Sequence, residues 1–369
     1  MNLHRNGRIA ALFATAVVFA ACSSSGSTAA PTTAPTTAPT TAPSAAASTE
    51  ASAPGSAAAG GSNIVFIPKA INNPYFDAAA KGAQEAATAL GGQFKQIGAQ
   101  TSSAADQIPF IQDATTQGYN AIVVSATDPD AIAPALKAAM AAGIKVVGYD
   151  SSPAEGAYNV FVNQTDFSLI GGSMAQWACD LAPNCEGEVA ILSATATAPN
   201  QNAWIKDFNT ALSTDPKFAK LKLVDTVYGD DKPDVSTTQA QTLLQKHPNL
   251  KVIVAPTTVG IAAAAKVVQD AKASDKVKVT GLGLPNDMKA FVADGTSPEF
   301  GLWSVPDLGK LAYYVADMLV KGTIKGTPGE TFSVPGLNGD KPYTIGDKGV
   351  VILGPPFVFN KDNVNNFDF

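Results

Sequence analysis

The sequence predicts an α/β protein of two similar lobes, each built on a doubly wound parallel sheet and joined to the other by a multi-segment hinge. Short apolar runs alternate with longer Ala-rich segments of helical spacing. The runs are almost continuously apolar, which is typical of parallel strands covered by helices on both faces. Roughly five such strands precede Asn163 and four follow it, so we expect two sets.

The predicted strands and helices alternate along the chain after Ser62. Strands are expected at 64–67, 93–98, 121–125, 145–149, 160–162, 188–193, 222–228, 252–255 and 278–282. Helices are expected at 74–90, 103–116, 129–142, 168–181, 201–212, 236–246, 260–273 and 286–294. This region of about 300 residues is long enough for two domains with sizeable cores.

Residues 1–22 have the organisation of an export signal. Basic side chains between positions 4 and 8 precede an apolar run from 9 to 21, which is too short to span a bilayer permanently. The segment Phe19-Ala20-Ala21-Cys22 resembles the lipobox of bacterial lipoproteins, with Phe19 where Leu is usual. That resemblance implies acylation of Cys22. The alternative is a plain secretory peptide with a coincidental cysteine.

Residues 23–62 form a low-complexity stretch composed almost wholly of Ser, Thr, Ala, Pro and Gly, with Pro-Thr-Thr-Ala repeated from 31 to 42. Such a composition cannot bury a core, so we predict a disordered linker. Its r.m.s. reach is roughly 35 Å. We therefore expect an extracytoplasmic domain, lipid-anchored to the cell membrane and not inserted in it.

Charge and cysteine content exclude several classes of partner. The net charge is −6 and no basic stripe is visible, so no nucleic-acid partner is expected. Cys179 and Cys185 lie close together, and in an exported protein this spacing favours a local disulfide. His4 and His247 are the only histidines in the chain, so no zinc site can be assembled, and no metal or cofactor is expected.

Polar loops follow most of the predicted strands. Ligands bind outside the carboxyl ends of the strands in open parallel sheets, so these loops are the candidate site. They contain amides, hydroxyls, carboxylates, one Lys and two aromatic residues, and are found at 68–76, 126–128, 150–152, 163–164, 194–201, 256–258 and 283–286. This set suits a polyol, whose hydroxyls both donate and accept and whose C–H face packs on aromatic rings.

Single residues of these loops also have structural explanations. Asn73 and Asp128 each precede a Pro that opens a predicted helix, so either could be an N-cap. Asp150 follows a strand and has no nearby helix to cap, which favours a binding role. Lys69 also follows a strand, and a binding role is favoured for it as for Asp150 if the two lobes form a cleft. The Tyr75-Phe76 pair could stack on a ligand or belong to the core.

Catalytic motifs are absent from the sequence. It contains no Gly-x-Ser-x-Gly elbow and no Walker loop, and the glycines at 281 and 283 form half of a dinucleotide fingerprint. Two carboxylates in a cleft could act as in a glycosidase, but binding without turnover is the simpler interpretation. We therefore expect that the protein is not an enzyme.

From Ile64 to Phe369 the chain resembles periplasmic sugar-binding proteins of the ribose-binding type (type I), and most closely the substrate-binding proteins of rhamnose ABC transporters. The segments that carry the resemblance are Phe66-Ile67-Pro68-Lys69, Asn72-Asn73-Pro74-Tyr75-Phe76-Asp77, Val123-Val124-Ser125-Ala126, Tyr149-Asp150-Ser151, Asn200-Gln201-Asn202-Ala203-Trp204, Ala255-Pro256-Thr257-Thr258-Val259-Gly260, Phe300-Gly301-Leu302-Trp303 and Phe359-Asn360-Lys361-Asp362-Asn363. The resemblance implies a sugar receptor that closes on its ligand and presents it to a membrane permease.

The same segments are similar to a sister family, the receptors of the signal autoinducer-2. That similarity implies that Lys69, Asp150, Gln201 and Pro256 face the ligand, with 75–76 and Trp303 nearby. The signal receptors carry Asp where Asn200 stands and Ala where Thr258 stands, whereas the rhamnose family resembles this chain at both positions. Loss of a carboxylate and gain of a hydroxyl should change the preferred ligand, which favours rhamnose or a related deoxyhexose. The candidate ligand-binding residues are Lys69, Asn73, Tyr75, Phe76, Asp128, Asp150, Asn200, Gln201, Pro256, Thr258 and Trp303.

The resemblance also implies the lobe boundaries. We expect the N-terminal lobe at 63–164 plus about 305–332, and the C-terminal lobe at 165–304 plus about 333–369. The hinge crossings are expected near 163–165, near 303–306 and between 323 and 343. Three other roles stay open: an autoinducer-2 receptor, a receptor that serves a chemotaxis or sensor protein, and an exported carbohydrate enzyme. A sugar-responsive repressor is disfavoured because the N-terminus carries an export signal.

Overall fold

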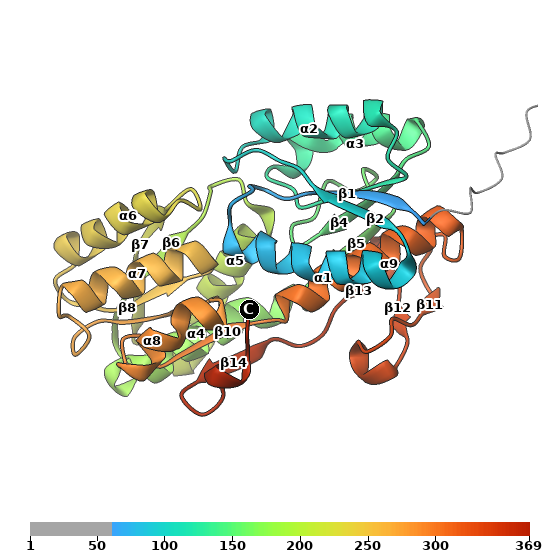
Figure 1. Cartoon of the computed structure of the whole chain (residues 1–369). Helices are drawn as coiled ribbons and strands as arrows, with labels where there is room; N and C mark the ends of the chain where they lie inside the picture. The colour runs from blue at the N-terminus through green and yellow to red at the C-terminus, as the bar shows by residue number, and fades with distance from the viewer. Residues whose placement is uncertain (1–60) are drawn as a thin grey trace, which may run out of the picture. The chain divides into compact units, whose positions relative to one another are not determined.

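The computed structural model describes residues 61–369, which belong to one compact unit (Figure 1). The expected signal peptide, Cys22 and the linker up to residue 60 lie outside the described residues. Within 61–369, no helix is both long enough and apolar enough to cross a membrane. The expected end of the linker at Ser62 is wrong, because Ser62 is buried and its hydroxyl donates to Asp317 Oδ1 at 2.7 Å.

The N-terminal lobe contains a parallel sheet of six strands. In spatial order they are β13 (Val350–Ile352), β5 (Val160–Asn163), β4 (Lys145–Tyr149), β3 (Ala121–Val124), β1 (Asn63–Ile67) and β2 (Gln93–Gln96). Residues alternate between the two faces of β1: Ile64 and Phe66 join one apolar cluster, Val65 and Ile67 the other. Both faces therefore need helical cover.

Four helices provide this cover. They are α1 (Pro74–Leu90) and α9 (Val305–Lys321) on one face and α2 (Ala104–Gln117) and α3 (Pro129–Ala141) on the other (Figure 1). The α1–α9 pair packs closely because glycine stands at the contact. A Cβ on Gly82 would lie 1.8 Å from the Pro306 carbonyl oxygen, and one on Gly309 would lie 1.8 Å from that of Ala79. Any larger residue at either position would force the helices apart.

The C-terminal lobe contains a second parallel sheet of four strands. In spatial order they are β7 (Leu221–Tyr228), β6 (Gly187–Ser193), β8 (Leu250–Ala255) and β9 (Lys278–Gly281). Its helices are α4 (Phe167–Leu181), α5 (Pro199–Thr214), α6 (Pro233–Lys246), α7 (Thr258–Asp270) and α8 (Pro285–Ala293), with α4 packed on α5 and α6 on α7. Beyond β9, the strand β10 (Glu299–Leu302) pairs antiparallel with β14 (Phe357–Asn360). Two similar α/β lobes are thus present, as expected.

Short elements complete the described region. A two-stranded antiparallel ribbon joins β11 (Thr331–Phe332) to β12 (Tyr343–Thr344). The 3-10 turns are η1 (Pro183–Cys185), η2 (Pro216–Phe218), η3 (Asn338–Asp340), η4 (Asp347–Gly349) and η5 (Val364–Asn366). The sequence pattern assigned no strand or helix after residue 294, so β10, α9 and the later elements are additions from the structure.

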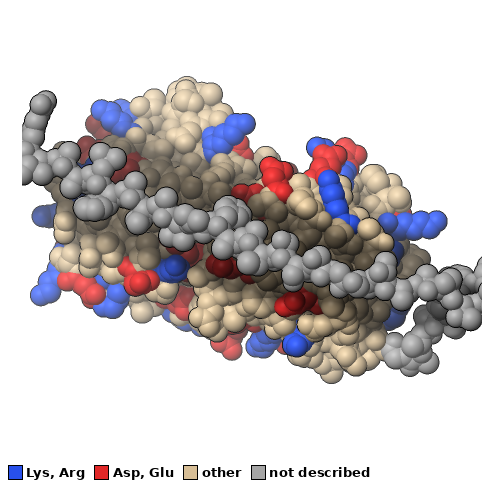
Figure 2. Space-filling view, turned by 90° about the horizontal axis from the view of Figure 1, so that it is seen from above, with Lys and Arg blue, Asp and Glu red and all other residues tan. Residues whose placement is uncertain are grey.

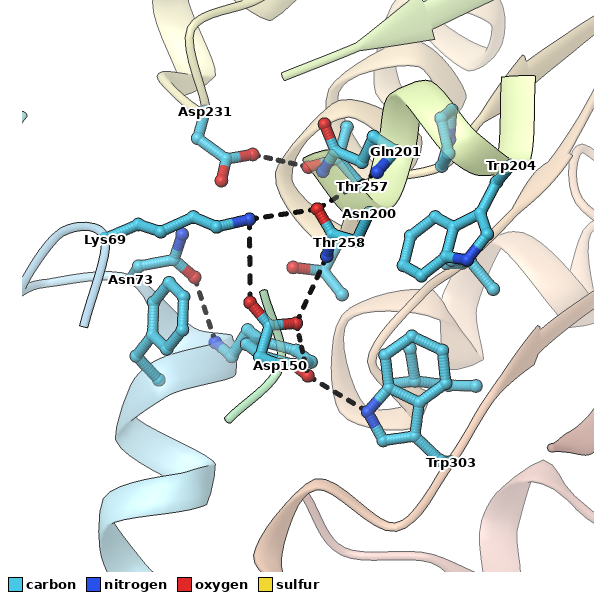
Figure 3. A pocket seen from close by; sticks show the side chains of 15 residues that line it. Lys69, Asn73, Asp150, Asn200, Gln201, Trp204, Asp231, Thr257, Thr258 and Trp303 are labelled. Carbon is cyan, nitrogen blue, oxygen red and sulfur yellow. Dashed lines mark hydrogen bonds and ion pairs between the residues drawn. The ribbon is translucent and has the colours of Figure 1, made fainter. Parts of the chain in front are cut away.

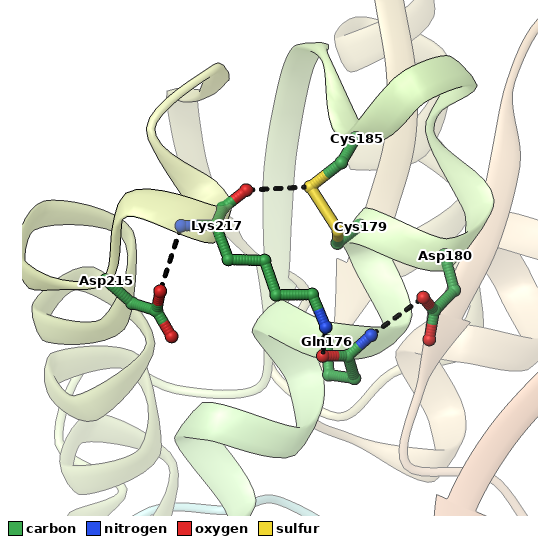
Figure 4. Close-up of a disulfide and its surroundings, with 6 residues drawn as sticks. All are labelled: Gln176, Cys179, Asp180, Cys185, Asp215 and Lys217. Atoms are coloured by element: carbon green, nitrogen blue, oxygen red, sulfur yellow. Dashed lines mark hydrogen bonds between the residues drawn. A yellow bond between two sulfur atoms is a disulfide. The ribbon is translucent and has the colours of Figure 1, made fainter.

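A disulfide joins Cys179, in the last turn of α4, to Cys185 at the end of η1 (Figure 4). Asn184 and Cys185 both have left-handed backbone angles, with φ of 57° and 54°, so the chain turns sharply here toward β6. The sulfur of Cys185 lies 3.3 Å from the Lys217 carbonyl oxygen. A disulfide sulfur carries no proton, so this approach is a contact and not a hydrogen bond. The bridge ties the end of α4 to the start of β6.

Within residues 61–369 the chain crosses between the lobes three times. The first crossing lies between Asn163 and Phe167, and the second between Leu302 and Val305, both where the sequence predicts them. The third prediction is wrong. Residues 350–352 pair with β5 of the N-terminal sheet, so the chain crosses at 353–356, after β13 and before β14. The expected C-terminal lobe segment from 333 therefore begins about twenty residues later.

Candidate functional site

A cavity lies between the strand ends of the two lobes (Figure 3). The space between its walls, including the part open to solvent, is about 370 Å³. Its walls are formed by Lys69, Asn73, Tyr75, Phe76, Asp150, Asn200, Gln201, Trp204, Asp231, Pro256, Thr257, Thr258, Leu282, Leu302 and Trp303. Most of them follow β1, β4, β6, β7, β8 or β9, as the carboxyl-end rule for parallel sheets predicts, whereas Leu302 and Trp303 lie at the end of β10.

Lys69, Asp150 and Asn200 form the polar centre of the cavity. Lys69 Nζ lies 3.5 Å from Asp150 Oδ2 and donates to Asn200 Oδ1 at 3.2 Å. Asn200 Nδ2 in turn donates to Asp150 Oδ1 at 3.4 Å. Lys69 and Asp150 belong to the N-terminal lobe and Asn200 to α5 of the C-terminal lobe, so this triangle joins the lobes.

The backbone directs the Asp150 carboxylate into the cavity. Asp150 directly follows β4 and has a φ of 59°, a left-handed conformation that Asp tolerates because its short polar side chain can bond locally. Ser125 Oγ donates to its Oδ2 at 2.7 Å and the Tyr75 hydroxyl to its Oδ1 at 3.1 Å. The carboxylate is thus buried but supplied with donors, which a buried charge requires.

Aromatic rings form the opposite wall. Trp303 Nε1 donates to the Tyr75 hydroxyl at 3.0 Å, so Trp303, Tyr75 and Asp150 form a chain of hydrogen bonds. Burial, and secondarily the Asp150 charge, raise the pKa of Tyr75 well above its usual value, which keeps its hydroxyl a donor. Trp204 lies beside Trp303, with ring centroids 5.9 Å apart. Figure 3 shows the two indoles together, across the cavity from Lys69.

Residues of the C-terminal lobe complete the polar wall. Gln201 Oε1 accepts from Ser193 Oγ and from the Ala194 amide, both at 3.1 Å, which fixes the orientation of its side chain. Thr257 Oγ1 donates to Asp231 Oδ1. Burial raises the pKa of Asp231 above its usual value, although Thr257 and the charge of Lys69 oppose this shift.

Gln107 of α2 holds the strand-end loops of the N-terminal lobe in place. Its Nε2 donates to the carbonyl oxygens of Pro68 and Ser125 at 3.1 and 2.8 Å. Its Oε1 accepts from the Thr127 amide and hydroxyl at 3.2 and 2.8 Å. The Thr127 carbonyl accepts in turn from Thr197 Oγ1 of the other lobe at 3.3 Å, a second polar link between the lobes outside the cavity.

The structure brings ten of the eleven candidate ligand-binding residues to the cavity. Asp128 is the exception, and its expected place in the site is wrong. Its carboxylate accepts from the amides of Asp130 and Ala131 at 3.1 and 3.0 Å, so it caps α3 and does not line the cavity. Asn73 combines both proposed roles, because it lines the cavity and accepts from the Tyr75 amide at 3.0 Å.

Five cavity residues were absent from the candidate set: Trp204, Asp231, Thr257, Leu282 and Leu302. Asp231 and Thr257 follow strands, as the carboxyl-end rule for parallel sheets requires. The rule could therefore have identified Asp231 from its position in the loop after β7. Trp204 lies within a predicted helix, where a buried aromatic residue reads as core. The two leucines carry no polar signal.

The arrangement can bind a small polar ring. No group of three or more His, Cys, Asp or Glu side chains in 61–369 could hold a metal ion. On the parts of the face that are visible in Figure 2, positive and negative side chains are interspersed. The fold and this cavity define a two-lobed binding protein.

The comparisons with known proteins agree with that class. The model of the periplasmic binding protein domain family matches residues 64–324, and the chain belongs to this family. An ABC transporter solute-binding protein from Clostridium phytofermentas, solved with bound L-rhamnose, is 39% identical, with a TM-score of 0.80 and coverage of 83% of this chain and 98% of that one.

Two further relatives extend the comparison. LsrB from Clostridium saccharobutylicum, solved in complex with AI-2, is 26% identical, with a TM-score of 0.77 and coverage of 83% and 99%. The ribose import binding protein RbsB of Escherichia coli is 26% identical over 278 residues, which are 72% of this chain and 87% of that protein. These relatives are binding proteins, which confirms the expectation that the chain is not an enzyme.

Proposed function

We propose that the protein is the extracytoplasmic sugar-binding component of an ABC transporter, and that its ligand is rhamnose or a related deoxyhexose. The observation that carries this proposal is the two-sided cavity between the lobes. Lys69, Asp150 and Asn200 meet on one side, while Trp204 and Trp303 lie on the other. Polar groups on one side and aromatic faces on the other match the hydroxyls and the C–H surface of a pyranose.

The apolar part of the cavity favours a sugar that lacks one hydroxyl. Leu282 and Leu302 line it and cannot hydrogen-bond, so a hydroxymethyl group placed against them would lose its partners. A methyl group at the same position has no hydrogen bonds to lose. The relative solved with L-rhamnose, a 6-deoxy sugar, is consistent with this chemistry.

The autoinducer-2 receptor is the second candidate function, because a relative solved in complex with AI-2 has the same fold. The family resemblance places Asp and Ala in those receptors where Asn200 and Thr258 stand. Asn200 bridges Lys69 and Asp150, so an Asp there would add a second carboxylate beside Asp150. This difference favours the sugar over the signal.

Closure is the proposed mechanism of delivery. A ligand held by groups of both lobes favours the closed form by its differential affinity for that form, and the three crossings form the hinge. The closed surface would then be presented to a membrane permease. Anchoring through an acylated Cys22 is proposed from the sequence alone, and intact-mass analysis of membrane-extracted protein would test it.

A ligand screen tests the proposal. Thermal shift and isothermal titration calorimetry with L-rhamnose, L-mannose, L-fucose, D-ribose and AI-2 should give the tightest binding for L-rhamnose. L-Mannose carries a hydroxyl on C6 and otherwise matches L-rhamnose, so it isolates the contribution of the apolar wall. Tighter binding of L-mannose or AI-2 than of L-rhamnose would refute the proposed ligand.

A further inference from the structure

Trp204 presents a hydrogen-bond donor that no protein group uses. Its side chain is buried and lines the cavity, and its Nε1 finds no acceptor among residues 61–369. An indole N–H can only donate, and a buried donor without an acceptor is unfavourable. The second cavity indole differs, because Trp303 Nε1 donates to Tyr75. The unused donor of Trp204 therefore points to a ligand acceptor.

Among the oxygen atoms of a pyranose, the ring oxygen is the acceptor best suited to this donor. Each sugar hydroxyl both donates and accepts, and is best matched by a group such as the Asp150 carboxylate, which can accept from it. The ring oxygen only accepts, so it needs a donor that offers no competing acceptor. Lys69 is also donor-only, but it is paired with Asp150 and Asn200.

The surroundings of Trp204 fit a ring oxygen. Phe167 and Trp303 pack around the indole, with ring centroids at 5.4 and 5.9 Å, and Leu282 and Leu302 line the same cavity. In a 6-deoxyhexose the ring oxygen is bonded to the carbon that carries the methyl group, so one ether oxygen and one methyl lie side by side. An apolar wall with a single donor matches that edge of the sugar.

We propose that the Trp204 indole N–H donates a hydrogen bond to the ring oxygen of the bound sugar and thereby orients the ring in the cavity. This inference rests on the proposed function and adds a contact that selects the ring orientation. The polar side of the cavity then receives the hydroxyls, and the deoxy carbon faces the leucines.

The test pairs a protein change with a ligand change. Calorimetry compares L-rhamnose with its carbocyclic analogue, in which CH2 replaces the ring oxygen, on wild-type protein and on Trp204→Phe. The wild type should bind the analogue about tenfold more weakly, equivalent to about 1.4 kcal/mol. Trp204→Phe should bind L-rhamnose about tenfold more weakly and should no longer distinguish the two ligands.

Two controls separate the hydrogen bond from packing. Trp177→Phe shortens a buried Trp that does not line the cavity, and it should keep the wild-type discrimination. Because Trp204→Phe could disturb the core, 3-benzothienylalanine at position 204 provides a second variant, in which sulfur replaces the N–H and the ring shape is kept. It should reproduce the loss of discrimination.

Each outcome decides between the hypotheses. Discrimination that persists without the N–H overturns the inference and leaves the proposed function intact, because the indole would then act through packing alone. Wild-type protein that binds L-rhamnose and its carbocyclic analogue equally well also overturns it. Wild-type protein that does not bind L-rhamnose overturns the proposed ligand, and with it the inference that rests on this ligand.

Discussion

Replacement of Asp150 by Asn should abolish tight sugar binding while the protein remains folded. Asn tolerates the left-handed backbone at this position, so the loop can keep its shape and only the charge is removed. The closed form would then bury Lys69 without its counter-charge, 3.5 Å from a neutral amide. A buried charge that loses its partner costs about 3–5 kcal/mol.

The cost falls mainly on the closed form, because an open cleft lets water reach Lys69. A bias of about 3 kcal/mol against closure corresponds to at least about a hundredfold weaker binding. Calorimetry with L-rhamnose measures this change, and the melting temperature without sugar checks the fold. Asp128→Asn is the matched control, because that residue caps α3 outside the cavity and Asn is an equally good cap. Asp150→Asn protein that bound within about threefold of wild type would refute the role assigned to the carboxylate.

Three further predictions follow from other contacts. Thr197→Val removes the hydroxyl that links the lobes outside the cavity, so calorimetry should show about fivefold weaker sugar binding, whereas Thr197→Ser should bind like wild type. Burial raises the pKa of Asp231 in the folded protein, so at this residue the folded state binds more protons than the unfolded state, and the residue's contribution to stability should fall as pH rises from about 4 through the folded pKa. Chemical denaturation at several pH values should show that Asp231→Asn lacks this pH-dependent contribution. Identical pH profiles of stability for the two proteins would contradict the prediction. Removal of the Cys179–Cys185 disulfide, which spans a sequence separation of 6, should lower the free energy of unfolding by about 2 kcal/mol without changing sugar affinity, and a changed affinity would show that the bridge shapes the cavity.

Much of the fold could be predicted because its signals are long and regular. Strands such as β4 and β8 are almost wholly buried, and helices such as α1 begin with an Asn-Pro cap, so periodicity and capping identified them. The C-terminal part could not be predicted in this way. β13 has three residues and β11 two, too few to show a period of two, so the third crossing was misplaced.

The candidate site was predictable to the extent that polar residues at strand ends mark it. Asp150 and Gln201 were found by this rule and line the cavity. Asp128 obeyed the same rule, but its carboxylate bonds to the amides of its own helix, a local alternative that sequence alone does not separate from ligand binding. Trp204 is the converse case, a residue of the site that the sequence did not identify. Only the structure shows that its buried indole has a hydrogen-bond donor without an acceptor.

The third crossing has a consequence for the order in which the protein can fold. The C-terminal sheet uses strands from one continuous stretch, 187–281, whereas the N-terminal sheet needs β13 at 350–352, and α1 needs α9 more than two hundred residues later. A chain that emerges from its N-terminus can therefore complete the second sheet before the first. Until β13 and α9 arrive, β5 remains an open edge, and the apolar face of α1 is uncovered. Truncation near residue 350 should thus damage the lobe that begins the folded chain as well as the one that ends it, because it removes β13 from the first sheet and β14 from its pairing with β10.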